Sequence, residues 1–212
     1  MEEGWIEARH FLNADMTAGS GNEAPWQVGE TRTYDGLVVL CESGYHSSPS
    51  WLDSLQYAPG PMACIVEVSP PVGRDGDKFV SQSRRLVAAA NVEGELRLFA
   101  CDCAERALLR EREHGREPDQ RSWTAVDVAR RYAHGEVTTE ELTAARDAAR
   151  DAARDAPGDA AWAAARAAAR AAAWDAAWAA AGDAARDAEI EWQRARLDEI
   201  LALVFRAEHA DR

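Results

Sequence analysis

The stretch DAAWAAARAAARAAAWDAAWAAAGDAARDA, residues 159–188, constrains the fold of this chain strongly. Almost every residue is alanine, the strongest helix former, and tryptophan or arginine recurs at every fourth position. A helix turns by about 100° per residue, so each step of four residues overshoots a full turn by about 40°. The recurring side chains therefore spiral around the helix. This excludes a heptad coiled coil and leaves only Trp174 and Trp178 on a shared face.

Helical patterns extend over the whole second half of the chain, so we expect residues 99–212 to form an all-helical, alanine-rich domain. Gly115, Gly135 and the Pro157-Gly158 pair are expected to end the first three helices. The four predicted helices span residues 99–115, 122–135, 138–156 and 159–208. Aspartate and arginine at i,i+3 spacing predict surface ion pairs: Asp147–Arg150, Asp151–Arg154 and Asp183–Arg186.

The end of the last helix carries an amphipathic stripe that must pack on another surface. We expect that surface to be the helices within residues 99–135. A second copy of the chain is the alternative, which would make a homodimer through the C-terminal helix. The stripe consists of Leu197, Ile200, Leu201, Val204 and Phe205.

Residues 1–98 predict a small α+β domain with a mixed or mostly antiparallel sheet. Residues 1–30 indicate a loosely structured lead-in with one short helix at most. We then expect a buried strand at 37–41, a helix at 51–57 that begins with a Ser50–Asp53 capping box, and a half-exposed strand at 63–69. The segment GRDGD is expected to be a loop, and residues 79–88 a strand pair or an irregular segment.

The chain carries 37 acidic and 24 basic side chains, for a net charge of −13. Because such a charge is repelled by phosphate backbones, direct nucleic-acid binding is disfavoured, and a protein with a basic surface is the partner we expect. The sequence has no run of 18 large apolar residues and no N-terminal signal pattern. We therefore expect a cytoplasmic protein with no membrane partner.

The four cysteines do not indicate a metal site. Cys101-x-Cys103 is too short for the common zinc spacing, and no histidine lies at a matching distance. We expect these thiols to be reduced, with Cys101 and Cys103 as small half-buried helix residues. Neither a metal nor a cofactor is predicted.

Two interpretations of the alanine-rich helix remain open. It is either a packed, partly exposed helical hairpin whose tryptophans supply its buried area, or a partner-binding face. The second follows from the residue types, because tryptophan and arginine dominate binding hot spots. The candidate partner-binding residues are Trp162, Arg166, Arg170, Trp174 and Trp178. Nucleic-acid binding through the same side chains is opposed by the flanking aspartates.

The segment CESGYHSSPS, the following helix with Gln-Tyr-Ala, and a strand ending in glutamate look like the middle of ADP-ribosyltransferase-type domains. This resemblance implies an enzyme in which Tyr45, His46 and Glu67 are catalytic. The upstream histidine or arginine motif of that family is missing here. A Cys41–His46 nucleophile pair has no third orienting residue. The alternative role of His46 is a turn residue that hydrogen-bonds its own loop.

Residues 36–90 resemble an uncharacterised domain of phage and bacterial proteins. That family has no established activity, so the resemblance implies no mechanism. The pattern is a Gly-aromatic-His turn, a proline, Leu-Asp, a tyrosine, a valine-rich strand and Asp-Lys. It is matched by Gly44, Tyr45, His46, Pro49, Leu52, Asp53, Tyr57, Asp77 and Lys78.

Residues 99–188 resemble a family of putative immunity proteins, in which a Cys-Asp-Cys-Ala-Glu-Arg helix precedes a second helix and an alanine-rich tail. The chain departs from the family at EPDQRSW, where an Asp-Asp-Arg-Pro-Arg stretch is usual. The resemblance implies a protein that binds and neutralises another protein. It is carried by Cys101, Asp102, Cys103, Ala104, Glu105, Arg106, Ala129, Arg130, Ala133, Gly135 and Glu136.

These observations predict a non-enzymatic inhibitory protein of immunity or phage anti-defence type. Its target would be a toxin or a defence complex, which it could block as an acidic mimic of nucleic acid. Two alternatives stay open: the ADP-ribosyltransferase-like enzyme, and a structural scaffold or virion component.

Overall fold

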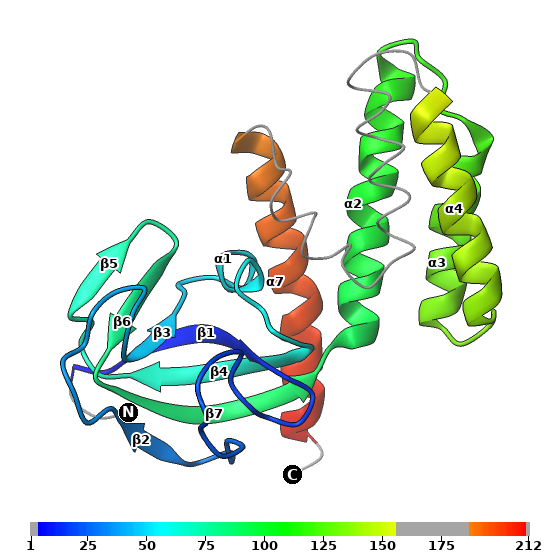
Figure 1. Ribbon diagram of the computed structural model, residues 1–212. Coiled ribbons are helices and arrows are strands. Elements are labelled where there is room, and N and C mark those ends of the chain that lie inside the picture. The colour runs from blue at the N-terminus through cyan, green and yellow to red at the C-terminus, as the bar shows by residue number, and fades with distance from the viewer. Residues whose placement is uncertain (1–3, 156–186, 211–212) are drawn as a thin grey trace. The chain divides into compact units, whose positions relative to one another are not determined.

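The computed structural model describes residues 4–155 and 187–210. The chain divides into two compact units, a sheet unit of Met1–Glu93 with Glu191–Arg212, and a helical unit of Gly94–Ile190. Antiparallel strands precede the helices along the chain (Figure 1), which confirms the predicted α+β class.

The sheet unit contains two antiparallel sheets with strand orders β1-β4-β7-β2 and β3-β6-β5. An isolated bridge between Arg9 and Ser48 joins β1 to the end of β3, and Gln82 alone separates β6 from β7. The two sheets therefore enclose a common interior. The strands are β1 (Ile6–Leu12), β2 (Thr31–Thr33), β3 (Tyr45–Ser47), β4 (Met62–Val68), β5 (Gly73–Asp75), β6 (Lys78–Ser81) and β7 (Ser83–Asn91).

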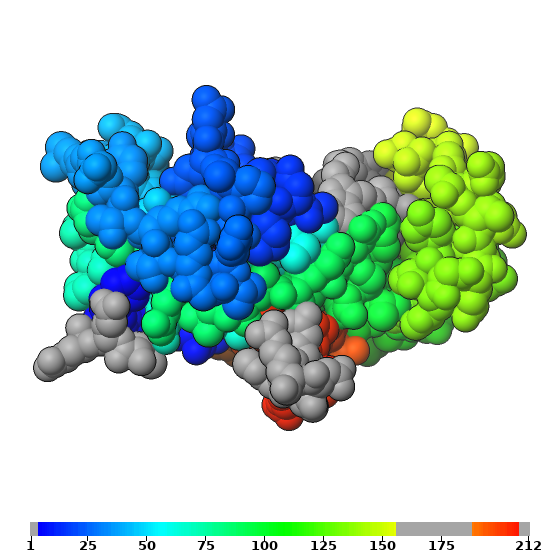
Figure 2. Space-filling view, turned by 90° about the horizontal axis from the view of Figure 1, so that it is seen from below, coloured from blue at the N-terminus to red at the C-terminus, as the bar shows by residue number. Residues whose placement is uncertain are grey.

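The first strand, β1, corrects the expectation of a loose lead-in. Its ladder pairs Ile6 with Val68 and Leu12 with Met62 on β4. Ala8 and Leu12 are buried in the interior, whereas Phe11 is buried on the opposite face. The strand was missed because it is short and because residues 13–30, which follow it, are rich in glycine and proline. Those later residues, between β1 and β2, contribute to the surface of the sheet unit in Figure 2.

The predicted buried strand at residues 37–41 is wrong. Leu37 is 83% exposed, and the segment is a turn closed by a bridge between Val39 and Ser43. Cys41 takes a left-handed backbone conformation with φ of 66°, which does not fit a strand. The strand begins only at Tyr45, after Gly44, where an added Cβ would lie 2.8 Å from the Val38 side chain.

Ser50 caps the predicted helix, although the Asp53 carboxylate accepts from the Ser50 hydroxyl and not from its backbone N–H as in a full capping box. Helix α1 (Trp51–Leu55) begins after Ser50, whose Oγ accepts a hydrogen bond from the Asp53 backbone N–H at 3.2 Å. Strand β4 follows, but it is not half-exposed as predicted, since Glu67 is only 9% exposed and β4 lies between two other strands. Residues 79–88 span parts of two strands, β6 and β7, but these strands belong to different sheets and do not pair with each other. The segment expected to be a loop contains strand β5.

The amphipathic stripe of the last described helix, α7 (Asp187–Ala210), packs in the sheet unit. Leu197, Leu201 and Phe205 are buried, and the Phe205 ring stacks on Trp51 at 5.5 Å between centroids. Figure 1 shows this part of α7 beside the four-stranded sheet. The helices within residues 99–135 were the expected target, whereas these contacts lie in the sheet unit. The periodicity reveals an apolar stripe but carries no information about its partner.

The helical unit contains α2 (Glu93–Glu113), α3 (Gln120–Ala133) and α4 (Thr139–Asp155), followed by the first turn of α7. Helix α2 begins six residues before the predicted start. Gly115 and Gly135 follow α2 and α3 with φ of 76° and 73°, as expected for residues that end helices. The core of the unit consists of Cys101, Ala104, Leu108, Val126, Ala129 and Leu142.

Helix α4 begins with a capping box that was not predicted, and its predicted i,i+3 ion pairs are confirmed. The Thr138 Oγ1 accepts from the Glu141 backbone N–H at 3.2 Å, and the Glu141 carboxylate accepts from the Thr138 N–H at 2.7 Å, which is a capping box. The i,i+3 ion pairs Asp147–Arg150 and Asp151–Arg154 are both formed.

Candidate functional site

Tyr45, the first residue of the predicted catalytic set, is held in the core of the sheet unit. It is 8% exposed, and its hydroxyl donates to the Glu23 carboxylate at 3.1 Å. Burial, and after it the negative charge of Glu23, raises the pKa of Tyr45 to about 12. The Trp26 ring contacts it edge-on, with centroids 5.5 Å apart. The phenol therefore stays protonated near neutral pH and anchors Glu23.

His46 hydrogen-bonds its own loop, which was the alternative role considered for it. Its Nε2 accepts from the Cys41 backbone N–H at 2.7 Å, and the ring also makes a hydrogen bond to the Gly44 backbone. Desolvation is the largest cause that lowers the pKa of His46. Because Nε2 already accepts from the Cys41 amide, it is not free to deprotonate the Cys41 thiol.

Glu67 lies on β4 and forms an ion pair with Arg85, its cross-strand neighbour on β7. Tyr45 and His46 are successive residues of β3, so their side chains point to opposite faces of that strand. Within the described residues, no hydrogen bond or ion pair joins Glu67 to either of them. A catalytic role for these three residues stays a prediction.

A polar cluster that we did not predict as a site surrounds Lys78, the only lysine of the chain. The Tyr57 hydroxyl donates to both oxygens of Asp77 at 3.0 and 2.9 Å, and the Lys78 ammonium lies 4.8 Å from the Tyr57 ring centroid. Lys78 also hydrogen-bonds Cys41, an exposed thiol. The cluster thus brings together the turn before β3, the residues after α1 and the β5–β6 turn.

The residues of this Lys78 cluster interact through hydrogen bonds and through the charges of Lys78 and Asp77. The hydrogen bond with Cys41 and then that with Tyr57 raise the pKa of Lys78, so its ammonium stays protonated and cannot serve as a general base. His46, Tyr57, Asp77 and Lys78 all belong to the pattern that carries the first family resemblance. That family pattern was therefore the one sequence signal that could have pointed to the Lys78 cluster. The spacing of these residues along the chain does not indicate that they lie close together.

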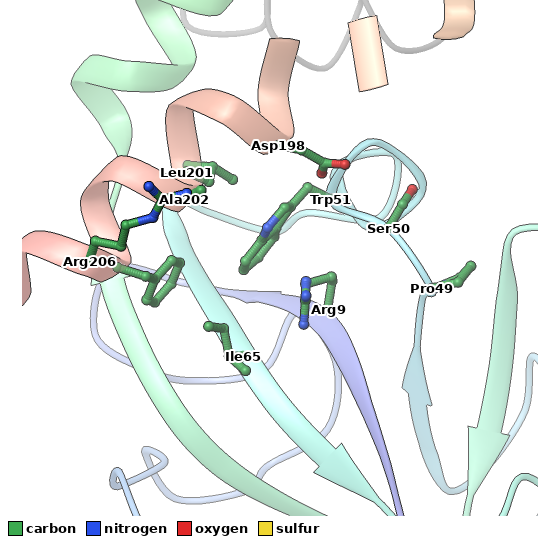
Figure 3. A pocket seen from close by; sticks show the side chains of 10 residues that line it. Arg9, Pro49, Ser50, Trp51, Ile65, Asp198, Leu201, Ala202 and Arg206 are labelled. Carbon is green, nitrogen blue, oxygen red and sulfur yellow. The ribbon is translucent and has the colours of Figure 1, made fainter. Parts of the chain in front are cut away.

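A pocket of about 460 Å³ lies between α7, α1 and the four-stranded sheet, within the sheet unit (Figure 3). The Trp51 ring lies between α7 and the strand that carries Arg9, whose guanidinium is 5.2 Å from the ring centroid. Desolvation, the largest cause, raises the pKa of Asp198 at this pocket, and the positive charge of Arg9 partly lowers that pKa again. Apolar rings and aliphatic side chains thus meet two guanidiniums and one carboxylate. The lining residues are Arg9, Pro49, Ser50, Trp51, Ile65, Asp198, Leu201, Ala202, Phe205 and Arg206.

In the helical unit, the motif that carries the second resemblance holds α2 to α3. Arg130 on α3 pairs with Asp102 at 2.8 Å and also with Glu105, both on α2. Cys101, Ala104 and Ala129 fill the core beneath these ion pairs. The small residues let the two helices approach closely, and the ion pairs fix their register. These motif residues therefore support the fold of the helical unit.

The cysteines of this motif are structural. Cys101 and Cys103 are both buried, and burial is the largest cause that raises the pKa of each thiol. The pKa of Cys101 is raised to about 12. Among residues 4–155 and 187–210, no group of three or more histidine, cysteine, aspartate or glutamate side chains is arranged to hold a metal ion. None of the helices within those ranges is long and apolar enough to cross a membrane.

The predicted partner-binding residues lie outside the part of the chain that the structure describes. Trp162, Arg166, Arg170, Trp174 and Trp178 all fall within residues 156–186. Their assignment as a binding face stays a prediction.

Comparison with known families assigns both halves of the chain. Residues 6–98 match the model of a domain of unknown function, DUF7666. Residues 90–177 match the model of an Imm-5 like putative immunity protein. Neither the comparison with curated proteins nor that with solved structures found a match.

The two matches locate the features described above. The residues that match the DUF7666 model include the Lys78 cluster and both sheets, while those that match the Imm-5-like model include the Arg130 ion pairs and all of α3 and α4. The Imm-5-like match also extends to residue 177 and so includes Trp162 and Trp174 of the predicted binding face.

Proposed function

We propose that this chain is a non-enzymatic inhibitor that binds and neutralises a protein target, as immunity proteins do. The observation that carries the proposal is the match of residues 90–177 to the Imm-5-like family. The helical unit supports it, because Arg130 on α3 pairs with Asp102 and Glu105 on α2, so the motif residues of this family hold the helices together.

The charge of the chain supports a basic partner. The net charge is −13, and Glu113, Asp127 and Glu140 are exposed on α2, α3 and α4. Such a surface attracts a basic protein and repels nucleic acid. We infer that the target is a toxin or a defence complex with a basic surface. Mimicry of nucleic acid in a basic groove, of the phage anti-defence type, is one form of this inhibition.

The direct test is co-expression with the products of the genes that flank this one in its genome. We expect one of them to arrest growth alone, and the chain to restore growth and form a stoichiometric complex with it on size exclusion. If the chain relieved the arrest while leaving the target unbound and altered in mass, the inhibitor proposal would be wrong and an enzymatic role would replace it.

The proposed binding face is tested separately. Changing Trp162, Trp174 and Trp178 together to alanine is expected to abolish capture of the target while circular dichroism and Tm stay close to wild type. Lys78→Met, in the Lys78 cluster of the other domain, is the matched control and should leave capture unchanged. Undiminished capture by the triple variant would contradict the proposed face.

Light scattering addresses the scaffold alternative. A structural scaffold or virion component forms stable oligomers at micromolar concentration, whereas an inhibitor of this type is expected to stay a small species until its target is added. A large assembly of the chain alone would favour the scaffold.

A further inference from the structure

Arg84 is buried in the interior between the two sheets of the sheet unit. The residue is 4% exposed and lies on β7 opposite Val68 of β4. Its guanidinium carbon is 5.1 Å from the Tyr45 ring centroid and 5.6 Å from that of Trp26, and one terminal nitrogen donates to the His46 carbonyl. Among the described residues, no carboxylate forms an ion pair with Arg84.

Five side chains of this interior have buried polar atoms without a hydrogen-bond partner among the described residues. They are Arg84 Nε, Trp26 Nε1, Ser47 Oγ, Ser81 Oγ and His10 Nε2, and Arg84 acts electrostatically on His10. The Arg84 and Trp26 nitrogens can only donate, whereas the hydroxyls and the neutral His10 ring can donate or accept. Two obligate donors in this set are therefore unpaired, and an unpaired buried donor costs about 1–3 kcal/mol.

The topology places these donors around Tyr45. Ser81 is its cross-strand partner on β6, and Ser47 lies two residues along β3 on the same face. The Trp26 ring contacts Tyr45 edge-on at 5.5 Å, and Arg84 lies against the same tyrosine. Trp26, Ser47 and Ser81 are each no more than 3% exposed.

The interior also lacks a negative charge to balance Arg84. Tyr45 and Cys64 act on Arg84 and could become negatively charged, but burial raises the pKa of each to about 12, so both are neutral. Glu23 acts on Arg84 only at a distance, while its carboxylate is engaged by Tyr45 and Arg32. Burial accordingly lowers the pKa of Arg84 to about 10. A water molecule would satisfy hydrogen bonds but would leave this charge uncompensated.

We propose that the interior of the sheet unit binds a small monovalent anion of the chloride class, held by Arg84 Nε–H together with the donors of Trp26, Ser47 and Ser81. A halide accepts several N–H and O–H donors at once and carries the missing charge. The anion is then part of the folded sheet unit, whose stability depends on halide concentration. This proposal is independent of the inhibitor function.

Crystals of the full chain grown with bromide in place of chloride test the site directly. We expect an anomalous peak within hydrogen-bond distance of Arg84 Nε. Bromide peaks confined to the protein surface, or a peak at Arg84 with no anomalous signal, which is the signature of water, would overturn the proposal.

Thermal unfolding of the wild-type chain provides a second measurement. Raising chloride from about 1 mM to about 300 mM, with gluconate holding the ionic strength constant, is expected to raise Tm by several degrees. Arg84→Met should lose this dependence, whereas Arg85→Met, which removes the neighbouring arginine paired with Glu67, should keep it. Trp26→Phe retains the aromatic ring but removes one donor, so more chloride should be needed for the same shift. A wild-type Tm that is insensitive to chloride would contradict the site even if Arg84→Met fails to fold.

Discussion

The rings of Trp51 and Phe205 stack with centroids 5.5 Å apart and planes inclined by 10°, although one lies in α1 and the other near the C-terminus. A second contact joins the same two helices, because Arg194 on α7 lies 3.2 Å from the Asp53 carboxylate. The C-terminal half of α7 is therefore part of the fold of the N-terminal sheets. The sheet unit is discontinuous in sequence, with the helical unit inserted into it.

Removing the Phe205 ring is expected to destabilise the sheet unit. Phe205 is 6% exposed, and Phe205→Ala should lower the free energy of unfolding by about 3 kcal/mol, because it leaves a cavity beside Trp51. Urea unfolding followed by tryptophan fluorescence measures the change. Leu203→Ala, at a residue of the same helix that is 61% exposed, is the control and should cost less than about 1 kcal/mol. Equal losses for the two variants would argue against this docking of α7.

The hydroxyl of Ser50 stabilises the start of α1. It donates to the buried Asp53 carboxylate at 2.6 Å and accepts from the Asp53 N–H, so Ser50→Ala should cost about 1–2 kcal/mol. Ser50→Thr retains a hydroxyl and should recover most of the loss. Chemical denaturation of both variants, with exposed Ser20→Ala as the control, checks this. A Thr variant as unstable as the Ala variant would point to a packing defect instead of a lost cap.

Stability is expected to fall as the pH is lowered from about 6.5 to 5.5. Desolvation by burial is the largest cause that lowers the pKa of both His10 and His46 below the ordinary histidine pKa of about 6.5. In this window the unfolded chain binds more protons than the folded one, so the free energy of unfolding increases with pH and its full value is reached above pH 6.5. Equilibrium denaturation at several pH values measures the slope.

His46→Asn is the informative variant for this pH dependence. It removes one of the two histidines and should reduce the slope, while histidine proton resonances of the wild type should titrate below the ordinary range for both residues. A slope of zero or of opposite sign across this window would contradict the prediction.

The transferase alternative makes a separate prediction about NAD. Because Tyr45 binds Glu23 and Glu67 binds Arg85, we expect NAD to produce no shift in Tm and Glu67→Gln to leave any target neutralisation intact. Calorimetric or fluorescence-based unfolding with and without NAD checks the first part. An NAD-dependent stabilisation that disappears in Glu67→Gln would revive the enzyme.

Local signals in the sequence gave several elements correctly. The Ser50 cap of α1, the glycines that end α2 and α3, and the i,i+3 ion pairs of α4 depend on residues within one or two turns of each other. Such contacts are formed wherever the local backbone is helical, so spacing alone predicts them.

The candidate sites depended on contacts between distant segments. Lys78, Tyr57 and Cys41 belong to three segments that only the sheet topology brings together. Arg84 was indistinguishable in sequence from the exposed arginines around it. Its burial follows from its register opposite Val68, which no local pattern encodes.

The sequence by itself determined an α+β chain whose helical region carries an immunity-protein motif and whose last helix has an apolar stripe in need of a partner. Only the tertiary structure decided that this stripe packs in the sheet unit, that residues 37–41 form a turn, and that residues 6–12 form a strand instead of a loose lead-in. Periodicity specifies which residues must leave water, because burial of apolar surface is favourable wherever it occurs. The surface that receives them is decided by shape and pairing over the whole unit, as the stacking of Phe205 on Trp51 shows.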